Sequence, residues 1–274
     1  MTAVLGIDLD QTLIYSLRSA QCDAGSDTIW VEDYQNAPLS LMTRAAHDLL
    51  ADLSLRHLVV PVTTRTPEQY ARERLPGRVQ AVVCSNGGVV LRDGLRDAVW
   101  DKRLADLLAG VLPAAEVLPR FAAVGGQEWV SSYKQVEDLF VYLVAHSRDV
   151  VPQGWVEDLR AALAPGGWTV SVQGRKVYAV PDVVSKAAAA LHLSIEVGLP
   201  LLAAGDSLLD LPLLQAATWA IRPAHGELHA LDPHGQTWPK LAVTHASGAA
   251  AAAEILTRLD RTAVHGPPRT GSAL

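Results

Sequence analysis

Two acidic residues near the amino end, Asp8 and Asp10, follow a short apolar run at residues 3–7. In an extended strand, residues i and i+2 point to the same face, so the two carboxylates would crowd one small volume. Like charges that close repel, and one carboxyl would take up a proton unless a cation lay between them. A divalent cation that prefers oxygen ligands, most simply Mg²⁺, would remove that cost. The alternative is that the two aspartates only shape a turn or cap a helix.

Three further polar groups lie where a predicted strand ends or a predicted helix begins. They are Thr63-Thr64-Arg65 after the apolar run 59–62, Lys186, and the stretch 205–210 with Asp206 and Asp210 after the run 201–204. In α/β proteins, ligands bind at the carboxyl ends of the strands. The pattern therefore predicts one site that gathers carboxylates, a hydroxyl group and a lysine at a single edge of a sheet.

Strand-like and helix-like segments alternate at both ends of the chain. The predicted strands cover 4–8, 57–63, 81–84, 201–204, 218–221 and 241–244, and the predicted helices cover 39–55, a segment from about 67, 185–193, 208–216 and 248–259. Such alternation predicts a parallel sheet with helices on both faces. The expected fold class is α/β, with a doubly wound, mostly parallel, Rossmann-like core sheet.

The middle of the chain, residues 87–179, has a different pattern. Strand-like pieces at 89–91, 138–145, 168–173 and 176–179 are joined through turns and are interrupted by predicted helices at 101–112 and 155–163. This predicts a smaller α+β domain inserted into a core made of residues 1–86 and 180–264. The Gly-, Pro- and Ser-rich segment 265–274 is expected to be a disordered tail.

The composition excludes several classes of function. The chain has 274 residues, 49% of them apolar and 19% charged, with a net charge of −6, which is typical of a globular protein without a basic face for a nucleic-acid polymer. Cys22 and Cys84 form neither a disulfide framework nor a zinc pattern. No apolar stretch approaches the ~20 residues of a membrane span, and the opening residues lack a secretory signal. We therefore expect a cytoplasmic protein with no membrane partner.

In their order along the chain, the four polar groups resemble the four motifs of the haloacid dehalogenase superfamily, most of whose members are magnesium-dependent phosphatases. The inserted domain resembles the α/β cap of subclass IIB, which lies between the second and third motifs. The stretch 84–89 is similar to the Asn-Gly turn that leads into such a cap. The resemblance implies Mg²⁺ as cofactor and a small phosphorylated metabolite as substrate, hydrolysed through an aspartyl-phosphate.

The resemblance also implies a role for each motif residue. Asp8 would be the nucleophile, and Asp10 would act first as general acid and then as general base. Thr63 would donate a hydrogen bond to a phosphoryl oxygen, and Lys186 would supply positive charge beside the nucleophile. The implied metal ligands are Asp8, the backbone carbonyl of Asp10, Asp206 and Asp210.

The second motif has other interpretations. Thr63 could instead cap the helix that is predicted near Pro67, and Thr64 competes for the same task. Thr64 also stands where relatives often carry glycine, which narrows the space beside the phosphate. Arg65 could bind substrate or simply pair with a carboxylate.

Plainer interpretations exist for the later motif residues as well. Lys186 could be an ordinary solvated lysine of a helix, and Asp210 could be a surface acid. Asn86 could contact substrate, or it could only shape its turn, since Asn-Gly is a common turn sequence.

Four residues of the inserted domain are candidates for substrate recognition, because cations can hold a second anionic group and tryptophan can stack on a base or a sugar. They are Arg120, Trp129, Lys134 and Arg175. The alternative is that these are solvated surface charges and a packed tryptophan.

Residues 10–16, 62–70 and 74–77 are similar to a bacterial branch of the superfamily found in tellurium-resistance-type gene clusters. That likeness implies a nucleotide or phosphoribosyl-type substrate, whereas other subclass IIB relatives act on sugar phosphates. The alternative functions are a phosphomutase with the same intermediate and a catalytically idle regulator that binds a phosphorylated ligand. The sequence leaves the oligomeric state open.

Overall fold

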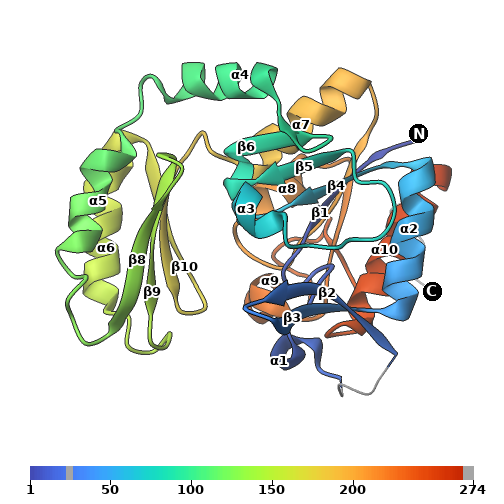
Figure 1. The fold of residues 1–274 in the computed structure, drawn as a ribbon, viewed down its shortest axis with the longest axis horizontal. Coiled ribbons are helices and arrows are strands. Elements are labelled where there is room, and N and C mark those ends of the chain that lie inside the picture. Colours follow the sequence, from blue (N-terminus) through green and yellow to red (C-terminus); the bar gives the residue numbers. More distant parts are fainter. Residues whose placement is uncertain (23–26, 268–274) are drawn as a thin grey trace. The chain divides into compact units, whose positions relative to one another are not determined.

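The computed structural model describes residues 1–22 and 27–267, and the chain divides into two compact units (Figure 1). The first, which we call the core unit, combines Met1–Asp97 with Lys186–Leu274. The second, the inserted unit, is Ala98–Ser185. No helix in the described part of the chain has both the length and the hydropathy needed to cross a bilayer.

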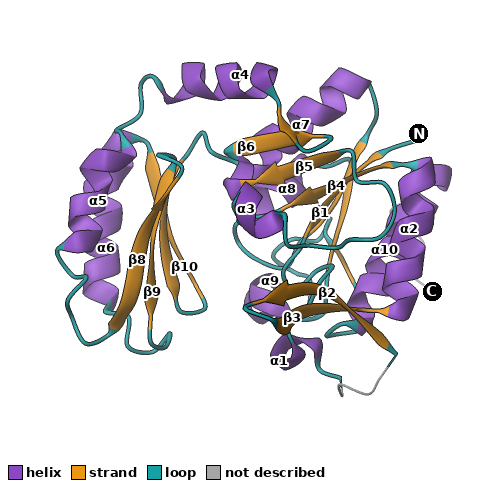
Figure 2. Ribbon diagram, viewed as in Figure 1, coloured by secondary structure: helices purple, strands orange, loops and turns teal. Residues whose placement is uncertain are grey.

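An eight-stranded sheet forms the centre of the core unit (Figure 2). The strands lie in the order β14 (Ala242–Val243), β13 (Trp219–Arg222), β12 (Leu201–Ala204), β1 (Val4–Asp8), β4 (Leu58–Val62), β5 (Ala81–Cys84), β6 (Val89–Arg92) and β7 (Leu95–Arg96). The strands from β14 to β5 run parallel, and β6 and β7 extend the sheet in antiparallel fashion. Strand β1 therefore lies inside the sheet, between β12 and β4. The predicted α/β class is confirmed.

Helices cover both faces of this sheet, which is why its strands are apolar without alternation. Leu5 and Ile7 of β1 share a buried cluster with residues of α2 (Arg44–Arg56) and α10 (Ala250–His265). Gly6 points the other way, and a Cβ atom there would lie 3.6 Å from a methyl carbon of Leu213 in α8 (Leu211–Ala216). Helix α7 (Lys186–Val197) packs beside α8 on that second face.

The remaining core elements are short. They are α1 (Leu17–Ala20), the hairpin of β2 (Thr28–Tyr34) and β3 (Ala37–Thr43), α3 (Pro67–Tyr70), the 3₁₀ turn η1 (Ser85–Gly87) and α9 (Gly226–Leu231). The helix predicted near Pro67 is confirmed as α3.

The predicted helix 39–55 is wrong in its first residues. Residues 37–43 form β3 instead, because they pair with β2, and the sequence analysis did not predict a strand there. The strand gives way to α2 at Thr43, whose hydroxyl accepts a hydrogen bond from the backbone of Ala46 at 3.2 Å.

The inserted unit is an antiparallel four-stranded sheet with helices. Across the sheet the order is β10 (Trp168–Gln173), β11 (Lys176–Pro181), β9 (Phe140–Ala145) and β8 (Val130–Val136). The helices are α4 (Ala98–Leu108), α5 (Ala114–Ala122), α6 (Gln153–Leu163) and the 3₁₀ turn η2 (Ala164–Gly166). Helix α5 contacts β8 and β9, and α6 contacts β10.

The borders of the inserted unit differ from the predicted 87–179. Strand β6 pairs with β5 in the core sheet, so the core extends to Asp97, and it resumes at Lys186 rather than at residue 180. The sequence of a short hairpin strand such as β6 does not indicate which of two sheets the strand will join. Of the tail predicted at 265–274, His265 ends α10, and residues 268–274 lie outside the described residues.

Candidate active site

Three neighbouring strands end at the same edge of the core sheet and carry polar residues there. Strand β1 pairs in parallel with β12 and β4, with Ile7 opposite Ala204 and Asp8 opposite Val62. The residues that follow these partners, Asp206 and Thr63, are therefore brought to Asp8. The predicted edge-of-sheet arrangement is what the pairing produces.

Lys186, the first residue of α7, lies between two aspartates. Its Nζ donates hydrogen bonds to Asp8 Oδ1 and Asp210 Oδ1, both at 2.6 Å. The lysine is only 2% exposed and Asp210 is fully buried, so neither is the solvated helix residue of the plainer interpretation. Burial alone would lower the pKa of Lys186, but the charges of Asp210 and Asp8 raise it above its usual value. The side chain therefore stays a cation.

The turn after β12 orients Asp210. Its Oδ2 accepts hydrogen bonds from the Ser207 backbone N–H at 3.0 Å and from the Ser207 hydroxyl at 2.7 Å. A Cβ atom on Gly205 would lie 2.5 Å from the Asp210 Cβ, so glycine is required at that position. With both oxygens engaged, Asp210 is held rigidly beside Lys186.

The donor set of this edge fits a hard divalent cation. Asp8, Asp206 and Asp210 each offer a carboxylate oxygen, and the three oxygens lie within 4.8 Å of one another. Burial, with the charge of Asp210 adding and that of Lys186 opposing, raises the pKa of Asp8 to about 7. Burial and the charge of Asp8 raise the pKa of Asp206 well above its usual value, and no donor among the described residues reaches the Asp206 carboxylate. When all three carboxyl groups are ionised, one ammonium group leaves negative charge that Mg²⁺ would neutralise.

Asp10 lies at the rim, with its side chain 54% exposed, and is paired with Arg65. Arg65 Nε donates to Asp10 Oδ2 at 3.0 Å and Nη2 donates to Oδ1 at 2.8 Å. The third guanidinium nitrogen, Nη1, lies 2.9 Å from Glu32 Oε2 and also pairs with Glu73. Of the two interpretations of Arg65, the structure has the pairing with carboxylates.

Thr63 is fully buried, and its Oγ1 accepts the backbone N–H of Arg65 at 3.1 Å. Its own hydroxyl hydrogen is thus available for a further acceptor. The cap of α3 is Thr66, so neither Thr63 nor Thr64, which is half-buried, has that alternative role. The buried Asn86 has a left-handed backbone with φ of 58° and donates its backbone N–H to the Thr63 carbonyl at 2.9 Å. The Asn-Gly turn therefore lies directly beside Thr63.

A histidine and a glycine that the sequence analysis did not predict complete this edge. His225 Nε2 donates to the Gln11 carbonyl at 2.8 Å, and Nδ1 accepts the Gly248 N–H at 3.1 Å. These partners need a neutral imidazole, and burial lowers the pKa of His225 accordingly. A Cβ atom on the next residue, Gly226, would lie 2.5 Å from Asp206 Oδ2. The pair has no motif spacing, so nothing in the sequence could have identified it.

Beside Asp10 the core unit has a cavity of about 550 Å³. Its lining includes Asp10, Arg65, Ser40, Arg18 and His225. Such a volume can hold a small metabolite.

The four candidates of the inserted unit do not gather in one place. Trp129 donates its indole N–H to Gln127 at 2.6 Å, and its ring lies 5.3 Å from that of Trp155, so it is a packed tryptophan. Arg120 is exposed on α5, and Arg175 lies in the turn between β10 and β11.

Lys134 lies on the sheet face away from α5. Its neighbour Tyr133 lies beside Gly125, just after α5, and adjacent residues of a strand point to opposite faces. Lys134 is paired across the sheet with Tyr142, whose ring lies 5.6 Å from the Lys176 ammonium. Two lysines and a tyrosine therefore share this face.

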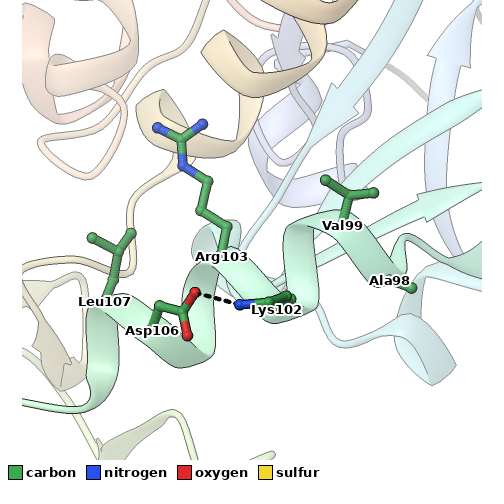
Figure 3. A pocket seen from close by; sticks show the side chains of 6 residues that line it. All are labelled: Ala98, Val99, Lys102, Arg103, Asp106 and Leu107. Atoms are coloured by element: carbon green, nitrogen blue, oxygen red, sulfur yellow. Dashed lines mark hydrogen bonds and ion pairs between the residues drawn. The ribbon is translucent and has the colours of Figure 1, made fainter.

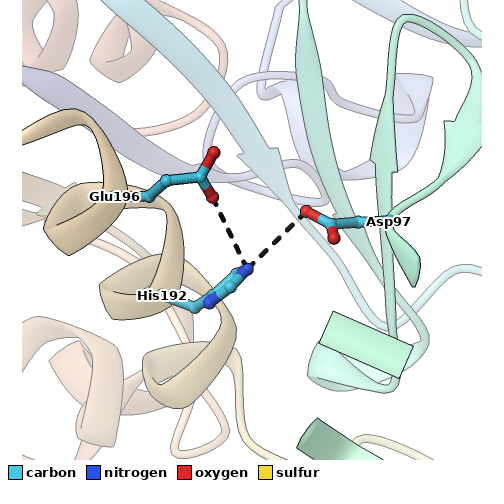
Figure 4. A group of neighbouring side chains, drawn as sticks. All are labelled: Asp97, His192 and Glu196. Atoms are coloured by element: carbon cyan, nitrogen blue, oxygen red, sulfur yellow. Dashed lines mark ion pairs between the residues drawn. The ribbon is translucent and has the colours of Figure 1, made fainter. Parts of the chain in front are cut away.

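Two other features of the described chain carry no chemistry of this kind. Asp97, His192 and Glu196 form a second group of metal-ligand types (Figure 4), but Arg92 already pairs with both carboxylates. A cavity of about 570 Å³ along α4 is lined by residues of that helix alone, and its Lys102 and Asp106 are paired with each other (Figure 3).

Comparison with known proteins identifies the fold. No protein-family model matches the sequence, and no curated protein matches it either. Among solved structures, a sucrose-phosphatase from Synechocystis sp. PCC6803, in complex with sucrose and phosphate, has a TM-score of 0.66 at 17% identity, over 94% of this chain and 98% of that chain.

Two further solved structures have a similar fold. A subclass IIB sugar phosphatase of the haloacid dehalogenase superfamily has a TM-score of 0.61 at 9% identity, over 96% of this chain and 99% of that chain. A trehalose-6-phosphate phosphatase from Aspergillus fumigatus has a TM-score of 0.52 at 14% identity, over 95% of this chain and 93% of that chain. The chain therefore has the fold of haloacid dehalogenase-type phosphatases, with an inserted antiparallel-sheet unit between the two parts of an α/β core.

Proposed function

We propose that this protein is a phosphatase that hydrolyses the phosphate monoester of a small metabolite through an aspartyl-phosphate on Asp8. The observation that carries the proposal is the buried arrangement of Lys186 between Asp8 and Asp210, with Asp206 beside them. Burying charges is costly even when they are paired, so a buried group of this kind calls for a functional explanation. An edge of this kind suits phosphoryl transfer, which depends on positioning and on the neutralisation of charge.

In the first step, the free oxygen of Asp8 attacks phosphorus, and the bond from phosphorus to the leaving oxygen breaks. Lys186 holds the other Asp8 oxygen and so fixes the direction of attack. Asp10 gives its proton to the leaving oxygen. In the second step, water attacks the phosphorus of the aspartyl-phosphate and passes a proton to Asp10, which frees Asp8 and inorganic phosphate.

Thr63 would donate its hydroxyl hydrogen to a phosphoryl oxygen. When bound to Asp8, Asp206, Asp210 and the Asp10 carbonyl, Mg²⁺ would neutralise negative charge on the phosphoryl group. Asn86, whose backbone N–H donates to the Thr63 carbonyl, would contact the same group.

For the substrate, we favour a sugar phosphate over a nucleotide. The solved structures of the same fold include a sucrose-phosphatase and a trehalose-6-phosphate phosphatase. The likeness to the tellurium-resistance branch, with its nucleotide or phosphoribosyl substrate, stays a prediction, as does the cytoplasmic location. The cavity beside Asp10 offers room for the leaving group.

The test is phosphate release by the purified protein, first from p-nitrophenyl phosphate and then from a panel of sugar phosphates and nucleoside monophosphates. We expect release that needs Mg²⁺, stops with EDTA and is lost in Asp8→Asn. Asp106→Asn, an exposed aspartate on α4, is the matched control and should keep full activity. No release by the unaltered protein from any substrate would refute the phosphatase and leave the binding regulator. An isomerised phosphosugar without free phosphate would identify the mutase.

A further inference from the structure

Arg65 is enclosed by carboxylates on every nitrogen of its guanidinium group. Nε and Nη2 form a fork on Asp10, and Nη1 pairs with Glu32 and Glu73. The Arg65 side chain is 12% exposed, whereas those of Glu32 and Glu73 are fully buried. The guanidinium group therefore cannot turn without breaking a buried ion pair.

A backbone contact brings the two glutamates together. Glu32 of β2 forms an isolated antiparallel bridge with Glu73, and the Arg74 N–H donates to the Val31 carbonyl at 2.7 Å. This bridge joins the segment after α3 to the β2–β3 hairpin. Both elements thus point a carboxylate at Arg65, from positions far apart in the sequence.

The two glutamates carry different charges near neutral pH. Burial alone would raise the pKa of Glu32, but hydrogen bonds from Ser40, Arg65 and Arg72 hold it below its usual value. Burial raises the pKa of Glu73 to about 8, with the charge of Arg65 opposing and that of Glu32 adding. Glu73 is therefore largely protonated at neutral pH, and Arg65 and Arg72 both face the charge of Glu32.

Asp10 depends on the Arg65 guanidinium group for its orientation. Its side chain is half exposed, and Arg65 is its sole hydrogen-bond partner among the described residues. An exposed aspartate without such a fork would exchange rotamers freely. Proton transfer requires a fixed carboxylate within hydrogen-bond reach of the reacting oxygen.

We infer that Arg65, held by Glu32 and Glu73, is a positioning residue that orients the Asp10 carboxylate for proton transfer to the leaving oxygen. The inference rests on the proposed phosphatase function. Burial of two glutamates and an arginine adds little stability that apolar side chains could not give. Glu32, Glu73 and Arg65 are explained instead by the orientation that they give to Asp10, a candidate catalytic residue whose carboxylate is exposed to solvent.

The consequence is a dependence on the leaving group. The p-nitrophenolate ion leaves without protonation, whereas a sugar alkoxide needs a proton from Asp10. Arg65→Ala should therefore lower kcat for a sugar phosphate by roughly tenfold or more beyond its effect on p-nitrophenyl phosphate, since general acid catalysis contributes about 10²–10⁴. Arg65→Lys should show the same split, because an ammonium group cannot form the fork.

The experiment compares both variants with Arg74→Ala on p-nitrophenyl phosphate and on the best sugar phosphate of the panel. Arg74 is a neighbouring arginine whose side chain pairs with Asp33 instead, at 2.9 Å. Its loss should leave the ratio of the two kcat values unchanged. Added guanidinium ion should restore part of the sugar phosphate activity of Arg65→Ala and should leave the activity of Arg74→Ala unchanged.

An equal loss on both substrates in Arg65→Ala and Arg65→Lys would overturn the inference and make the group purely structural. Should Arg65→Ala not fold, judged by circular dichroism, Arg65→Lys alone decides, since it keeps the buried positive charge. Absence of any phosphate release by the unaltered protein would instead refute the proposed function, so the two failures are distinguishable.

Discussion

Gly226 leaves the space that Asp206 occupies: a Cβ atom on the glycine would lie 2.5 Å from Asp206 Oδ2. The same glycine has a left-handed backbone with φ of +82°, which side chains disfavour. It follows His225, whose ring holds the loop after Asp10 through the Gln11 carbonyl. One dipeptide thus places a candidate metal ligand and the loop of the candidate acid.

We predict that Gly226→Ala weakens Mg²⁺ binding by roughly tenfold or more, as loss of support around a ligand does elsewhere. The added methyl group must displace the Asp206 carboxylate. Isothermal titration with Mg²⁺ measures the effect. Gly94→Ala is the matched control, because Gly94 has the same φ of +82° but nothing within 4 Å of its Cβ position. Equal affinities in the two variants would show that Asp206 is no ligand.

Mg²⁺ binding should strengthen as the pH rises from about 6 to 8. Burial raises the pKa of Asp8 from 3.8 to about 7, so the metal-free folded protein holds a proton there that Mg²⁺ must displace. Titration calorimetry in two buffers of different ionisation enthalpy should detect proton release near pH 7 and little at pH 9. Asp8→Asn should reduce the release, and an affinity independent of pH in this range would contradict the prediction.

Glu73 should make the folded protein less stable as the pH rises. Burial raises its pKa from 4.5 to about 8, so the folded state binds a proton that the unfolded state has released, and this contribution is lost between those pH values. The urea midpoint should therefore fall less between pH 5 and pH 8 in Glu73→Gln than in the unaltered protein. Glu157→Gln, an exposed change on α6, should leave the slope unaltered. Parallel curves for all three proteins would rule out a buried, protonated Glu73.

Lys134→Ala should raise KM for sugar phosphates by about tenfold, the value of one charge-assisted hydrogen bond, with little change in kcat for p-nitrophenyl phosphate. Lys134 shares its sheet face with Tyr142 and Lys176. Arg120→Ala is the comparison. Arg120 belongs to α5, which packs on the other face of the sheet, so loss of the Arg120 side chain should change KM little. Equal changes in KM in both variants would show that Lys134 does not take part in substrate recognition.

The sequence predicted the central strands of the core well, because β1, β5 and β12 are apolar runs that end in polar residues. Their shared edge follows from parallel topology, which is how Asp8 and Asp206 could be assigned to one place, whereas Lys186 was assigned from the resemblance of the motifs. The β2–β3 hairpin was missed, since its outer residues are exposed and its pairing is not encoded locally.

The supporting residues of the site could not be predicted. Glu32 and Glu73 meet through a backbone bridge between segments that share no sequence pattern. His225 and Gly226 act through contacts with Gln11 and Asp206, which lie far away in the chain. Motif spacing reports the groups that do chemistry, whereas the groups that hold them in place depend on tertiary structure.

Lys186 is the first residue of the core unit after the chain returns from the inserted unit. The two junctions of the inserted unit therefore differ in how well they should tolerate a change of length. The junction before Ala98 contains no candidate site residue, so residues can be added or removed there without moving one. A single residue gained or lost immediately before Lys186 would shift the start of α7 and move the Lys186 ammonium group away from both aspartates. A unit that replaces the inserted unit should therefore be joined upstream of Ser185, so that the residues next to Lys186 stay unchanged.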